Sequence, residues 1–498
     1  MNQPQICMTL TGKTLEENLR LVSKYEKQID LVELRVDHLN EDEQLYARKF
    51  PSLTKFPCIL TIRRDIDGGL FTGGEFTRTT LFGRALAFAN QDGAKNFAYV
   101  DFEEDYHIPS IQDAALAFGV KIIRSFHNMT EPVYNLKARC DSMRKTGYEI
   151  PKIAFMPKKL SDVVNMFKEG ASITEYEHIF CAMGVEGFPS RILSAFSNSL
   201  LTYTSPAELI GNTSGIGHLD PITINSLYNF RSISKDTSLY GITGWPMEKI
   251  ISPEIHNTGY KALGLDSVYF PLRSPLVSEA LNFAETLGMK GLSVSVPHKE
   301  SVLFYVHEQS PEVAQTGSCN CVVRKGTKWV GYNTEVIGFK KALDEFLGNR
   351  KIKHKKVAVI GAGAAAKAIC YVLKQMGAKV CIFNRSIAHA KQVAEKYGFS
   401  YCQLEPSCVQ TLDEYSDLII QATSVGGSSL EQQEVIDPIS FYTFRGDELL
   451  FDVVHKPAIT PVMRRASLAG CRVSNGYKML EYQAYEQFKL FTGHNYEI

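Results

Sequence analysis

Short apolar runs rich in β-branched residues recur along the N-terminal part of the chain, and amphipathic segments separate them. Such runs predict strands, whereas apolar residues three and four positions apart predict helices. The expected strands are residues 6–10, 30–36, 58–63, 97–102, 121–126, 152–156, 178–183 and 200–203. The expected helices include residues 16–25, 79–89, 131–145 and 160–167. Strands that alternate with helices in this way predict an α/β protein whose parallel strands close into an N-terminal (β/α)8 barrel.

Several of these strands carry charged residues, although a strand that is buried on both faces should be apolar. The period of two places Glu33, Arg35 and Asp37 on one face of their strand. Further charged or titratable residues lie at or near strand ends: Arg63, His127, Lys152 and Arg191. Each alone has a structural explanation, such as a solvated strand end or an ion pair inside the barrel. Together they share the end of the barrel at which such folds bind their substrates.

These residue types together support a specific chemistry. A lysine that is crowded by arginines and partly desolvated loses its proton more easily, so its neutral amine can attack a ketone. The resulting imine acidifies the adjacent carbon, and a histidine such as His127 can move protons on and off. Arg63 and Arg191 could bind a carboxylate, because planar guanidinium matches planar carboxylate. The pattern therefore predicts an anionic keto-acid substrate.

Five stretches resemble the type I 3-dehydroquinate dehydratase family over residues 1 to about 220. The stretches are Glu-Leu-Arg-Val-Asp at 33–37, Thr-Ile-Arg-Arg at 61–64, Ser-Phe-His-Asn at 125–128, Lys-Ile-Ala-Phe-Met at 152–156 and Met-Gly through Ser-Arg at 183–191. The resemblance implies that Lys152 forms the imine and that His127 is the general acid and base. It also implies a set of substrate-binding residues: Glu33, Arg35, Arg63, Arg191, Ser214 and His218.

The chain departs from this family at two places. Asp67 stands where the family usually has Glu, and the shorter carboxylate could alter the orientation of His127. In the closing loop Ser214 matches the family, but His218 replaces an amide and could add a charge over the substrate. Residues 1–218 are the expected barrel, and residues 219–238 lack a long apolar period and are expected to form a linker.

A second α/β pattern begins near residue 239, and its strongest motif joins an apolar run to a helix start at residues 356–368. A glycine-rich turn at this point lets the backbone approach a pyrophosphate, which the helix N-terminus attracts. The expected cofactor-binding residues of the turn are Gly361, Ala362, Gly363, Ala364 and Ala365. The motif predicts a Rossmann domain over residues 341–476.

The next strand, residues 379–383, ends in Asn384, Arg385 and Ser386. Folds that bind NAD commonly place an acidic residue here, whereas a cation favours the 2′-phosphate of NADP. We therefore expect NADP(H) as the cofactor. The alternative is that these three residues only cap a helix on a surface turn.

The second module resembles the shikimate dehydrogenase family across residues 239–498. The matching stretches include Tyr-Gly-Ile-Thr-Gly at 240–244, Val-Ser-Val-Pro-His-Lys at 294–299, Gly-Tyr-Asn-Thr-Glu at 331–335 and Ala-Thr-Ser-Val-Gly at 422–426. The resemblance implies a catalytic lysine, Lys299, paired with the carboxylate of Glu335. It implies that Ser252, Ser295, Asn320 and Gln483 bind the substrate, and that Val453 and Gly476 line the nicotinamide end.

The same resemblance implies a substrate-binding domain at residues 239–340, completed by a C-terminal helix at 477–498. Three positions depart from the family: Glu335 replaces Asp, Ile250 replaces Ser and His455 replaces Tyr. The isoleucine removes a hydroxyl that would contact the substrate carboxylate. We expect this change to alter substrate affinity and not the reaction.

The composition excludes several other functions. Lys plus Arg and Asp plus Glu each total 54, so no net charge draws the chain to nucleic acid or an anionic membrane. No apolar run approaches the ~20 residues that span a bilayer, and the first residues are not those of a signal peptide. The 11 cysteines show no CxxC pair, and the 12 histidines show no metal-ligand spacing. A cytoplasmic protein that acts on small molecules without a metal is therefore expected.

The two resemblances support each other, because the product of one family is the substrate of the other. They imply dehydration of 3-dehydroquinate to 3-dehydroshikimate, followed by its NADPH-dependent reduction to shikimate. Two alternatives remain open. The second module could be a quinate-type dehydrogenase that runs in the oxidative direction, or the chain could be a regulatory protein that binds these ligands without turnover.

Overall fold

The computed structural model describes residues 3–86, 92–247, 250–427 and 436–497, apart from the side chain of Ser214. The chain divides into two compact units. The first comprises Met1–Leu239, Gly264–Ser274 and Glu279–Gly288, and the second comprises Tyr240–Leu263, Pro275–Ser278 and Met289–Ile498.

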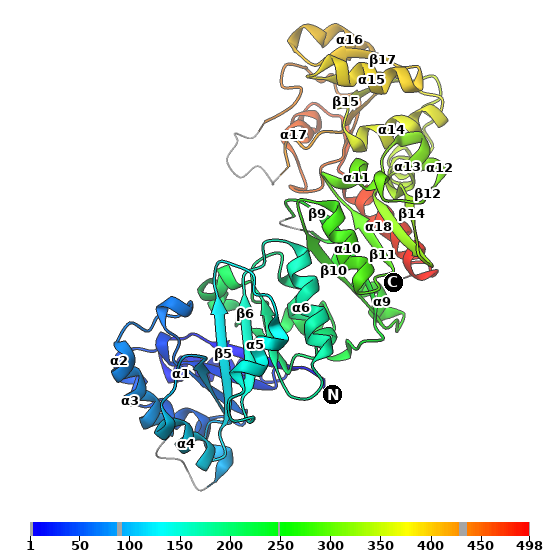
Figure 1. The fold of residues 1–498 in the computed structure, drawn as a ribbon. Coiled ribbons are helices and arrows are strands. Elements are labelled where there is room, and N and C mark those ends of the chain that lie inside the picture. Colours follow the sequence, from blue (N-terminus) through cyan, green and yellow to red (C-terminus); the bar gives the residue numbers. More distant parts are fainter. Residues whose placement is uncertain (1–2, 87–91, 248–249, 428–435, 498) are drawn as a thin grey trace. The chain divides into compact units, whose positions relative to one another are not determined.

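Eight parallel strands form the sheet of the N-terminal unit, as the sequence predicts (Figure 1). They are β1 (Gln5–Leu10), β2 (Leu31–Arg35), β3 (Cys58–Thr61), β4 (Tyr99–Glu103), β5 (Lys121–Asn128), β6 (Ile150–Phe155), β7 (Ile179–Ala182) and β8 (Leu201–Thr204). The order is β7-β6-β5-β4-β3-β2-β1-β8, so each strand lies beside its neighbours in the chain and β8 returns to β1. A single parallel bridge between His178 and Ser199 connects the two ends of the sheet. The sheet is therefore a nearly closed barrel.

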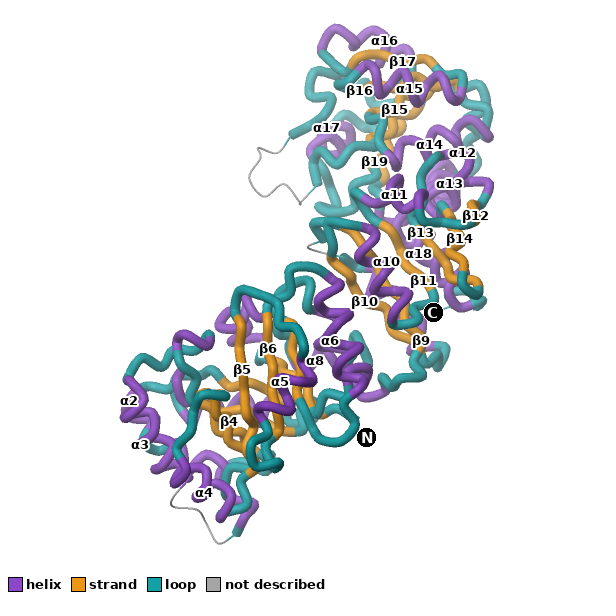
Figure 2. The backbone as a smooth tube through the Cα atoms, viewed as in Figure 1, coloured by secondary structure: helices purple, strands orange, loops and turns teal. Residues whose placement is uncertain are grey.

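Helices follow the strands and surround the barrel, as the tube drawing shows (Figure 2). They are α1 (Leu15–Tyr25), α2 (Glu41–Gln44), α3 (Gly74–Leu86), α4 (Pro109–Ala117), α5 (Leu136–Met143), α6 (Leu160–Ser172), α7 (Phe188–Ile192) and α8 (Pro221–Ser226). The four predicted helices correspond to α1, α3, α5 and α6; the predicted end of the second, at residues 87–89, lies outside the described residues.

The inside of the barrel has an apolar layer and a polar layer. The apolar layer contains buried residues from alternate positions of the strands, among them Cys7, Leu31, Ile59 and Ile179. The polar layer lies further along the strands, where Thr61 pairs in register with Asp101 and Ser125 with Lys152. Successive side chains of a strand point to opposite faces, so only alternate polar residues enter the barrel.

The predicted linker at residues 219–238 is folded. It contains α8 and the 3-10 helix Phe230–Ser232, and it buries the side chains of Ile224, Tyr228 and Ile233. Asp220 caps α8 by accepting hydrogen bonds from the backbone amides of Ile222 and Thr223. Burial of apolar side chains fixes this segment, although its sequence lacks a long apolar period.

A six-stranded mixed sheet has the order β10-β9-β11-β13-β14-β12. Its strands are β9 (Ser238–Gly244), β10 (Ser267–Arg273), β11 (Gly291–Val294), β12 (Glu308–Gln309), β13 (Cys321–Lys325) and β14 (Lys328–Tyr332). The helices of this region are α9 (Ser252–Ala262), α10 (Val277–Thr286), α11 (His298–Ser301), α12 (Pro311–Thr316) and α13 (Thr334–Leu347). The C-terminal helix α18 (Tyr477–Thr492) packs closely on α13. The two helices approach each other at Gly338, where a Cβ would lie only 2.7 Å from the carbonyl oxygen of Met479.

The last sheet is parallel and has the order β17-β16-β15-β18-β19-β20. Its strands are β15 (Lys356–Ile360), β16 (Lys379–Asn384), β17 (Ser400–Gln403), β18 (Leu418–Gln421), β19 (Leu449–Asp452) and β20 (Arg472–Ser474). Its helices are α14 (Ala364–Gln375), α15 (Ile387–Tyr397), α16 (Val409–Glu414) and α17 (Pro461–Leu468). With β15 as the first strand this is the 3-2-1-4-5-6 order of a dinucleotide-binding fold, which confirms the predicted Rossmann fold.

Alternate residues of β15 enter two different cores. Val357 and Val359 belong to the core built with α13, α14 and α15, whereas Ala358 and Ile360 belong to the core built with α16 and α17. A strand covered by helices on both faces must be apolar throughout, which explains its continuous apolar run. No helix in the described part of the chain has both the length and the apolar character needed to cross a membrane.

Candidate active sites

Lys152 is the third residue of β6 and is buried inside the barrel. Its Nζ donates a hydrogen bond to Oδ2 of Asp101 at 2.9 Å, and Oε1 of Glu33 lies 3.7 Å away. The ring of Tyr203 is on another side, with its centroid 4.3 Å from Nζ. The nearest charges to this lysine are therefore carboxylates. The sequence analysis expected arginines to crowd this amine, and that expectation is wrong for the nearest charged groups.

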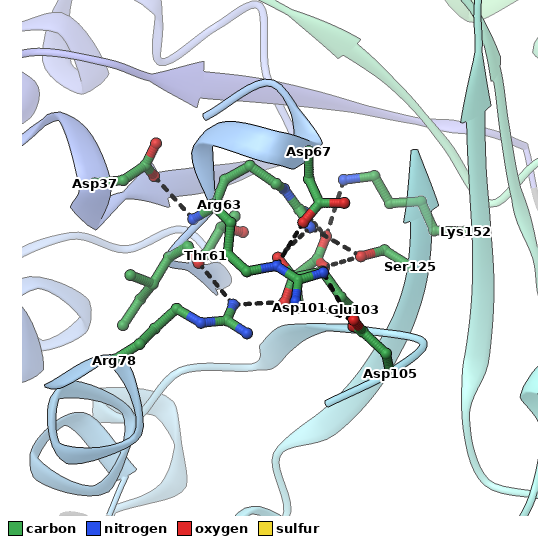
Figure 3. A network of polar contacts seen from close by, with 12 residues as sticks. Asp37, Thr61, Arg63, Asp67, Arg78, Asp101, Glu103, Asp105, Ser125 and Lys152 are labelled. Carbon is green, nitrogen blue, oxygen red and sulfur yellow. Dashed lines mark hydrogen bonds and ion pairs between the residues drawn. The ribbon is translucent and has the colours of Figure 1, made fainter. Parts of the chain in front are cut away.

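Asp101 is at the centre of a buried polar network (Figure 3). Its Oδ2 also lies 2.8 Å from a terminal nitrogen of Arg63, and its Oδ1 accepts a 2.5 Å hydrogen bond from the Ser125 hydroxyl. Burial opposes ionisation of Asp101, but the charges of Arg63 and Lys152 outweigh this and hold its pKa far below the ordinary value. Asp101 therefore stays ionised.

Arg63 lines the pocket but is paired within the protein (Figure 3). One terminal nitrogen contacts Asp101, and the other lies 2.8 Å from Oε1 of Glu103. Arg78 binds the second oxygen of Glu103, Oε2, at 2.5 Å. Both terminal nitrogens of Arg63 therefore have carboxylate partners within the protein, and its expected contact with a substrate carboxylate stays a prediction. The register between β3 and β4 places these carboxylates beside Arg63. Because the sequence alone does not give the register of two strands, it could not reveal these partners.

Arg191 and Arg35 also line this pocket. Arg35 makes a two-point ion pair with Asp37, at 2.9 and 2.7 Å. Arg191 is 2% exposed and donates a 2.8 Å hydrogen bond to the carbonyl oxygen of Ile216. Among the described residues no carboxylate lies within ion-pair distance of Arg191, so it is a buried cation that suits an anionic ligand.

His127, at the end of β5, lines the same pocket. Burial and the charges of Arg63 and Lys152 hold the pKa of its imidazole well below the ordinary value. The ring is therefore neutral near pH 7 and can accept a proton. Asp67 also lines the pocket, but its carboxylate binds Nε of Arg64 at 2.6 Å, so in the structure it orients Arg64 and makes no hydrogen bond to His127.

His218 lies in the pocket as well, with its ring parallel to that of Tyr203 at a centroid distance of 6.4 Å. Burial, together with the charge of Arg191, lowers the pKa of His218. A neutral imidazole is therefore favoured in the structure, which does not support the expected added charge over the substrate. Ser214 belongs to the 3-10 helix Ala207–Ile216, and its side chain lies outside the described residues.

The barrel also uses residues that the sequence analysis did not select. Asp101 and Glu103 alternate on β4 as Glu33 and Arg35 do on β2, and this period-two pair of charges was a usable signal. Tyr203 carried no such signal, because an aromatic residue in a buried strand is indistinguishable from a core residue.

A second pocket lies in the other unit, and its lining contains all four residues that were expected to bind its substrate. Its lining includes Ser252, Ser295, Lys299, Asn320, Glu335 and Gln483, together with the unusual Ile250 and His455. Nζ of Lys299 lies 2.5 Å from Oε1 of Glu335, and both side chains are largely buried. The pair is therefore not an exposed surface salt bridge.

The start of α13 holds Glu335 and Asn320 in position. Asn333 caps this helix by accepting a hydrogen bond from the backbone amide of Glu335 at 3.1 Å. Oδ1 of Asn320 accepts from the Thr334 amide at 2.7 Å, and its Nδ2 lies 3.4 Å from Oε1 of Gln483. The longer side chain of Glu335 therefore still reaches Lys299 from a fixed helix end.

The turn after β15 suits a dinucleotide. Gly361 has φ of +114°, and a Cβ at this residue would meet Cγ2 of Thr423 at 2.8 Å, so glycine is required. A Cβ on Gly363 would meet no described atom within 4 Å, so space is open at the N-terminus of α14. Ala362 completes the turn, and Ala364 and Ala365 are the first residues of α14, whose N-terminal backbone amides suit a phosphate.

The turn after β16 and the start of α18 carry further residues that were expected to bind the cofactor. Asn384 donates to the carbonyl oxygen of Ser386, and Arg385 is exposed without an ion pair to any described residue. A free cation at this strand end fits a 2′-phosphate. A Cβ on Gly476 would lie 1.9 Å from the carbonyl oxygen of Val453, so only glycine allows these two backbone segments to meet.

Family models match three parts of the chain. Type I 3-dehydroquinase matches residues 6–235. The shikimate dehydrogenase substrate binding domain matches residues 242–322, and the shikimate / quinate 5-dehydrogenase model matches residues 342–464.

Curated relatives match both the whole chain and its second part. A protein of Arabidopsis thaliana, named bifunctional 3-dehydroquinate dehydratase/shikimate dehydrogenase, chloroplastic, is 32% identical over 99% of this chain and 82% of its own length. The shikimate biosynthesis protein AroDE of Chlamydia pneumoniae is 26% identical over 98% of this chain and 95% of its own length. Shikimate dehydrogenase (NADP(+)) of Thermococcus kodakarensis is 34% identical over 52% of this chain and 92% of its own length. The chain belongs to the family of bifunctional 3-dehydroquinate dehydratase/shikimate dehydrogenases.

Proposed function

We propose that the chain catalyses two consecutive steps of the shikimate pathway. Its barrel dehydrates 3-dehydroquinate to 3-dehydroshikimate through an imine on Lys152, and its second unit reduces that ketone to shikimate with NADPH. The observation that carries the proposal is the presence on one chain of a buried, carboxylate-held Lys152 beside a neutral His127 and of a Lys299–Glu335 pair in a separate pocket.

In the barrel, the amine of Lys152 attacks the substrate ketone, and the carbonyl oxygen leaves as water. His127 takes the proton from the carbon adjacent to the imine, and the bond to the departing hydroxyl breaks as His127 returns a proton to it. Hydrolysis of the imine then restores the ketone and the lysine. The uncompensated charge of Arg191 binds the substrate carboxylate throughout.

In the dehydrogenase part of the chain, residues 239–340 and α18 form the substrate-binding domain, and residues 341–476 bind NADP(H). NADPH supplies the hydride when it is bound. Lys299 gives a proton to the carbonyl oxygen of the substrate, and Glu335 keeps the ammonium group oriented. Gly361 and Gly363 would leave room for the pyrophosphate, Arg385 would bind the 2′-phosphate, and Val453 and Gly476 would line the nicotinamide end.

A coupled assay tests the two activities together. Purified protein is mixed with 3-dehydroquinate and NADPH, and NADPH absorbance is followed for wild type and Lys152→Ala. We expect the variant to consume no NADPH from 3-dehydroquinate but to regain wild-type consumption when 3-dehydroshikimate is added. If wild type also needed added 3-dehydroshikimate, the proposal for the barrel would be wrong.

The state of the cysteines supports a proposal for the cellular compartment in which the enzyme works. All 11 cysteines carry free thiols, and all but one are buried. Reduced thiols support an enzyme that works in a reducing compartment such as the cytoplasm.

A further inference from the structure

We propose that Asp101 is the counter-ion of the imine nitrogen in the barrel, where it holds Lys152 in place and keeps the imine protonated during dehydration. This inference rests on the proposed dehydration through Lys152 and adds a residue to it.

The geometry fixes the carboxylate of Asp101 from three directions (Figure 3). Lys152 donates to its Oδ2 at 2.9 Å, and Arg63 lies 2.8 Å from the same oxygen. The Ser125 hydroxyl donates to the other oxygen at 2.5 Å. Asp101 is 1% exposed, so water does not screen these charges. A carboxylate held in this way cannot rotate away from the lysine nitrogen.

Glu33 is the other carboxylate near Lys152, but its contacts differ. Its two oxygens accept hydrogen bonds from the hydroxyls of Thr9 at 3.0 Å and Thr61 at 2.9 Å. Its distance of 3.7 Å from Nζ is too long for a hydrogen bond. Glu33 therefore adds negative potential, whereas Asp101 makes the direct contact.

Titratable or charged groups from the surrounding strands and loops also face this nitrogen. They are Cys7 of β1, Glu33 of β2, Arg63 after β3, Asp101 of β4, His127 of β5, Cys181 of β7, Tyr203 of β8 and His218 after β8. Burial raises the pKa of the thiols and of the phenol, and it lowers the pKa of the imidazoles. All of these groups are therefore neutral near pH 7. Of the described groups around this nitrogen, only the carboxylates of Asp101 and Glu33 can balance its positive charge, and Arg63 takes up part of their negative charge.

The chemistry requires such a counter-ion at two stages. An ammonium group and a ketone give a protonated imine and water, so the nitrogen carries one positive charge before and after the step. Asp101 can therefore keep the same contact in the free enzyme and in the intermediate. The protonated imine withdraws electrons more strongly than the neutral imine, which acidifies the adjacent carbon for His127.

The test is the pH dependence of dehydration in Asp101→Asn, which keeps the shape of the side chain and removes its charge. Loss of an opposite charge at this distance makes the protonated imine a stronger acid, by about 1–3 pH units. We expect the alkaline limb of kcat to move to lower pH by that amount. Trapping of the imine with borohydride should fall over the same pH range.

Glu103→Gln is the matched control. Glu103 is a second buried carboxylate on β4 and binds the same Arg63, but it contacts Arg78 and not Lys152. This variant should keep the wild-type alkaline limb. The proposal is overturned if Asp101→Asn leaves the limb unchanged, or if Glu103→Gln shifts it equally.

Further measurements cover a variant that fails to fold and separate the role of Asp101 from the proposed dehydration itself. If Asp101→Asn does not fold, Asp101→Glu should keep the alkaline limb at the wild-type pH even where kcat falls, and a downward shift would contradict the proposal. Reduction of added 3-dehydroshikimate by the same samples reports on the second unit. If wild type itself forms no borohydride-trapped adduct at Lys152, the proposed dehydration fails, and that result is distinct from failure of the Asp101 role.

Discussion

Three arginines line the barrel pocket, and their charges are balanced differently. Arg35 and Arg63 are paired with Asp37, Asp101 and Glu103, whereas no described carboxylate balances Arg191. An unpaired buried cation is costly, and an anionic ligand removes that cost. Arg191 is therefore the arginine most suited to the substrate carboxylate.

Arg191→Lys tests this role, because it keeps the charge and removes the two-point geometry. A hydrogen bond to a charged group contributes about 1.5–3 kcal/mol, so we expect KM for 3-dehydroquinate to rise about 10- to 100-fold. The change in kcat should be smaller. Steady-state kinetics on the dehydration step measure both constants. An unchanged KM in a folded variant would assign the carboxylate to another residue.

Ile250 lines the pocket of the second unit together with Ser252 and Lys299. Ile250→Ser would supply a hydroxyl at a position where the chain has none. One added hydrogen bond contributes about 0.5–1.5 kcal/mol, so KM for shikimate should fall about 2- to 10-fold. Comparing turnover on shikimate and quinate in both proteins also tests the quinate alternative. No change in KM on either substrate would contradict the role assigned to this position.

Residue types were predictable from the sequence, but their partners were not. Lys152, His127 and Arg191 stand out because charge in a buried strand is unusual, and they do meet in one pocket. The pairing of Arg63 with Asp101 and Glu103 depends on the register of β3 and β4, which period-two alternation leaves open. Tyr203 could not be found, since its residue type suits any buried strand.

At the scale of elements, the turn between β16 and α15 carries Arg385, the residue proposed to bind the 2′-phosphate of the cofactor. Arg385 is exposed there and makes no ion pair with another residue that the structure describes. Arg385→Ala should raise KM for NADPH about tenfold, because a charge-assisted contact to the 2′-phosphate is lost. KM for NADH should remain as in wild type, since NADH has no such phosphate. Equal changes for both cofactors would indicate a structural role of the turn.

Elements with a strong local pattern were predicted well, and those fixed by distant contacts were not. The eight barrel strands follow from local apolar runs, and each is present. The segment at residues 219–238 has a weak pattern, yet Ile224 and Tyr228 are buried and α8 forms. Tertiary burial determines such a segment, and its sequence alone does not reveal the surface that covers it.

At the scale of the whole molecule, both compact units contain buried histidines with a lowered pKa. In the first unit burial lowers the pKa of His127, His178 and His218. In the second unit burial lowers the pKa of His256 from 6.5 to about 3. His256 is fully buried in α9 and packs near Tyr260 and Phe488. In both units, a fall in pH should therefore reduce stability through the protonation of buried histidines.

This sensitivity predicts the direction in which pH changes stability. A histidine with a lowered folded pKa binds its proton more readily when unfolded, so stability is lost as pH falls below the unfolded value of about 6.5. For His256, with a folded pKa of about 3, the loss is about 2 kcal/mol at pH 5. His256→Phe removes this titration, so the difference in unfolding free energy between pH 7.5 and pH 5 should shrink by about that amount in the second unit. Urea unfolding of the full chain at both pH values measures it, and a change in overall stability cancels in the difference. If the variant and wild type lose equal stability between the two pH values, His256 is not a source of acid lability, and the histidines of the barrel remain to account for any loss that is observed.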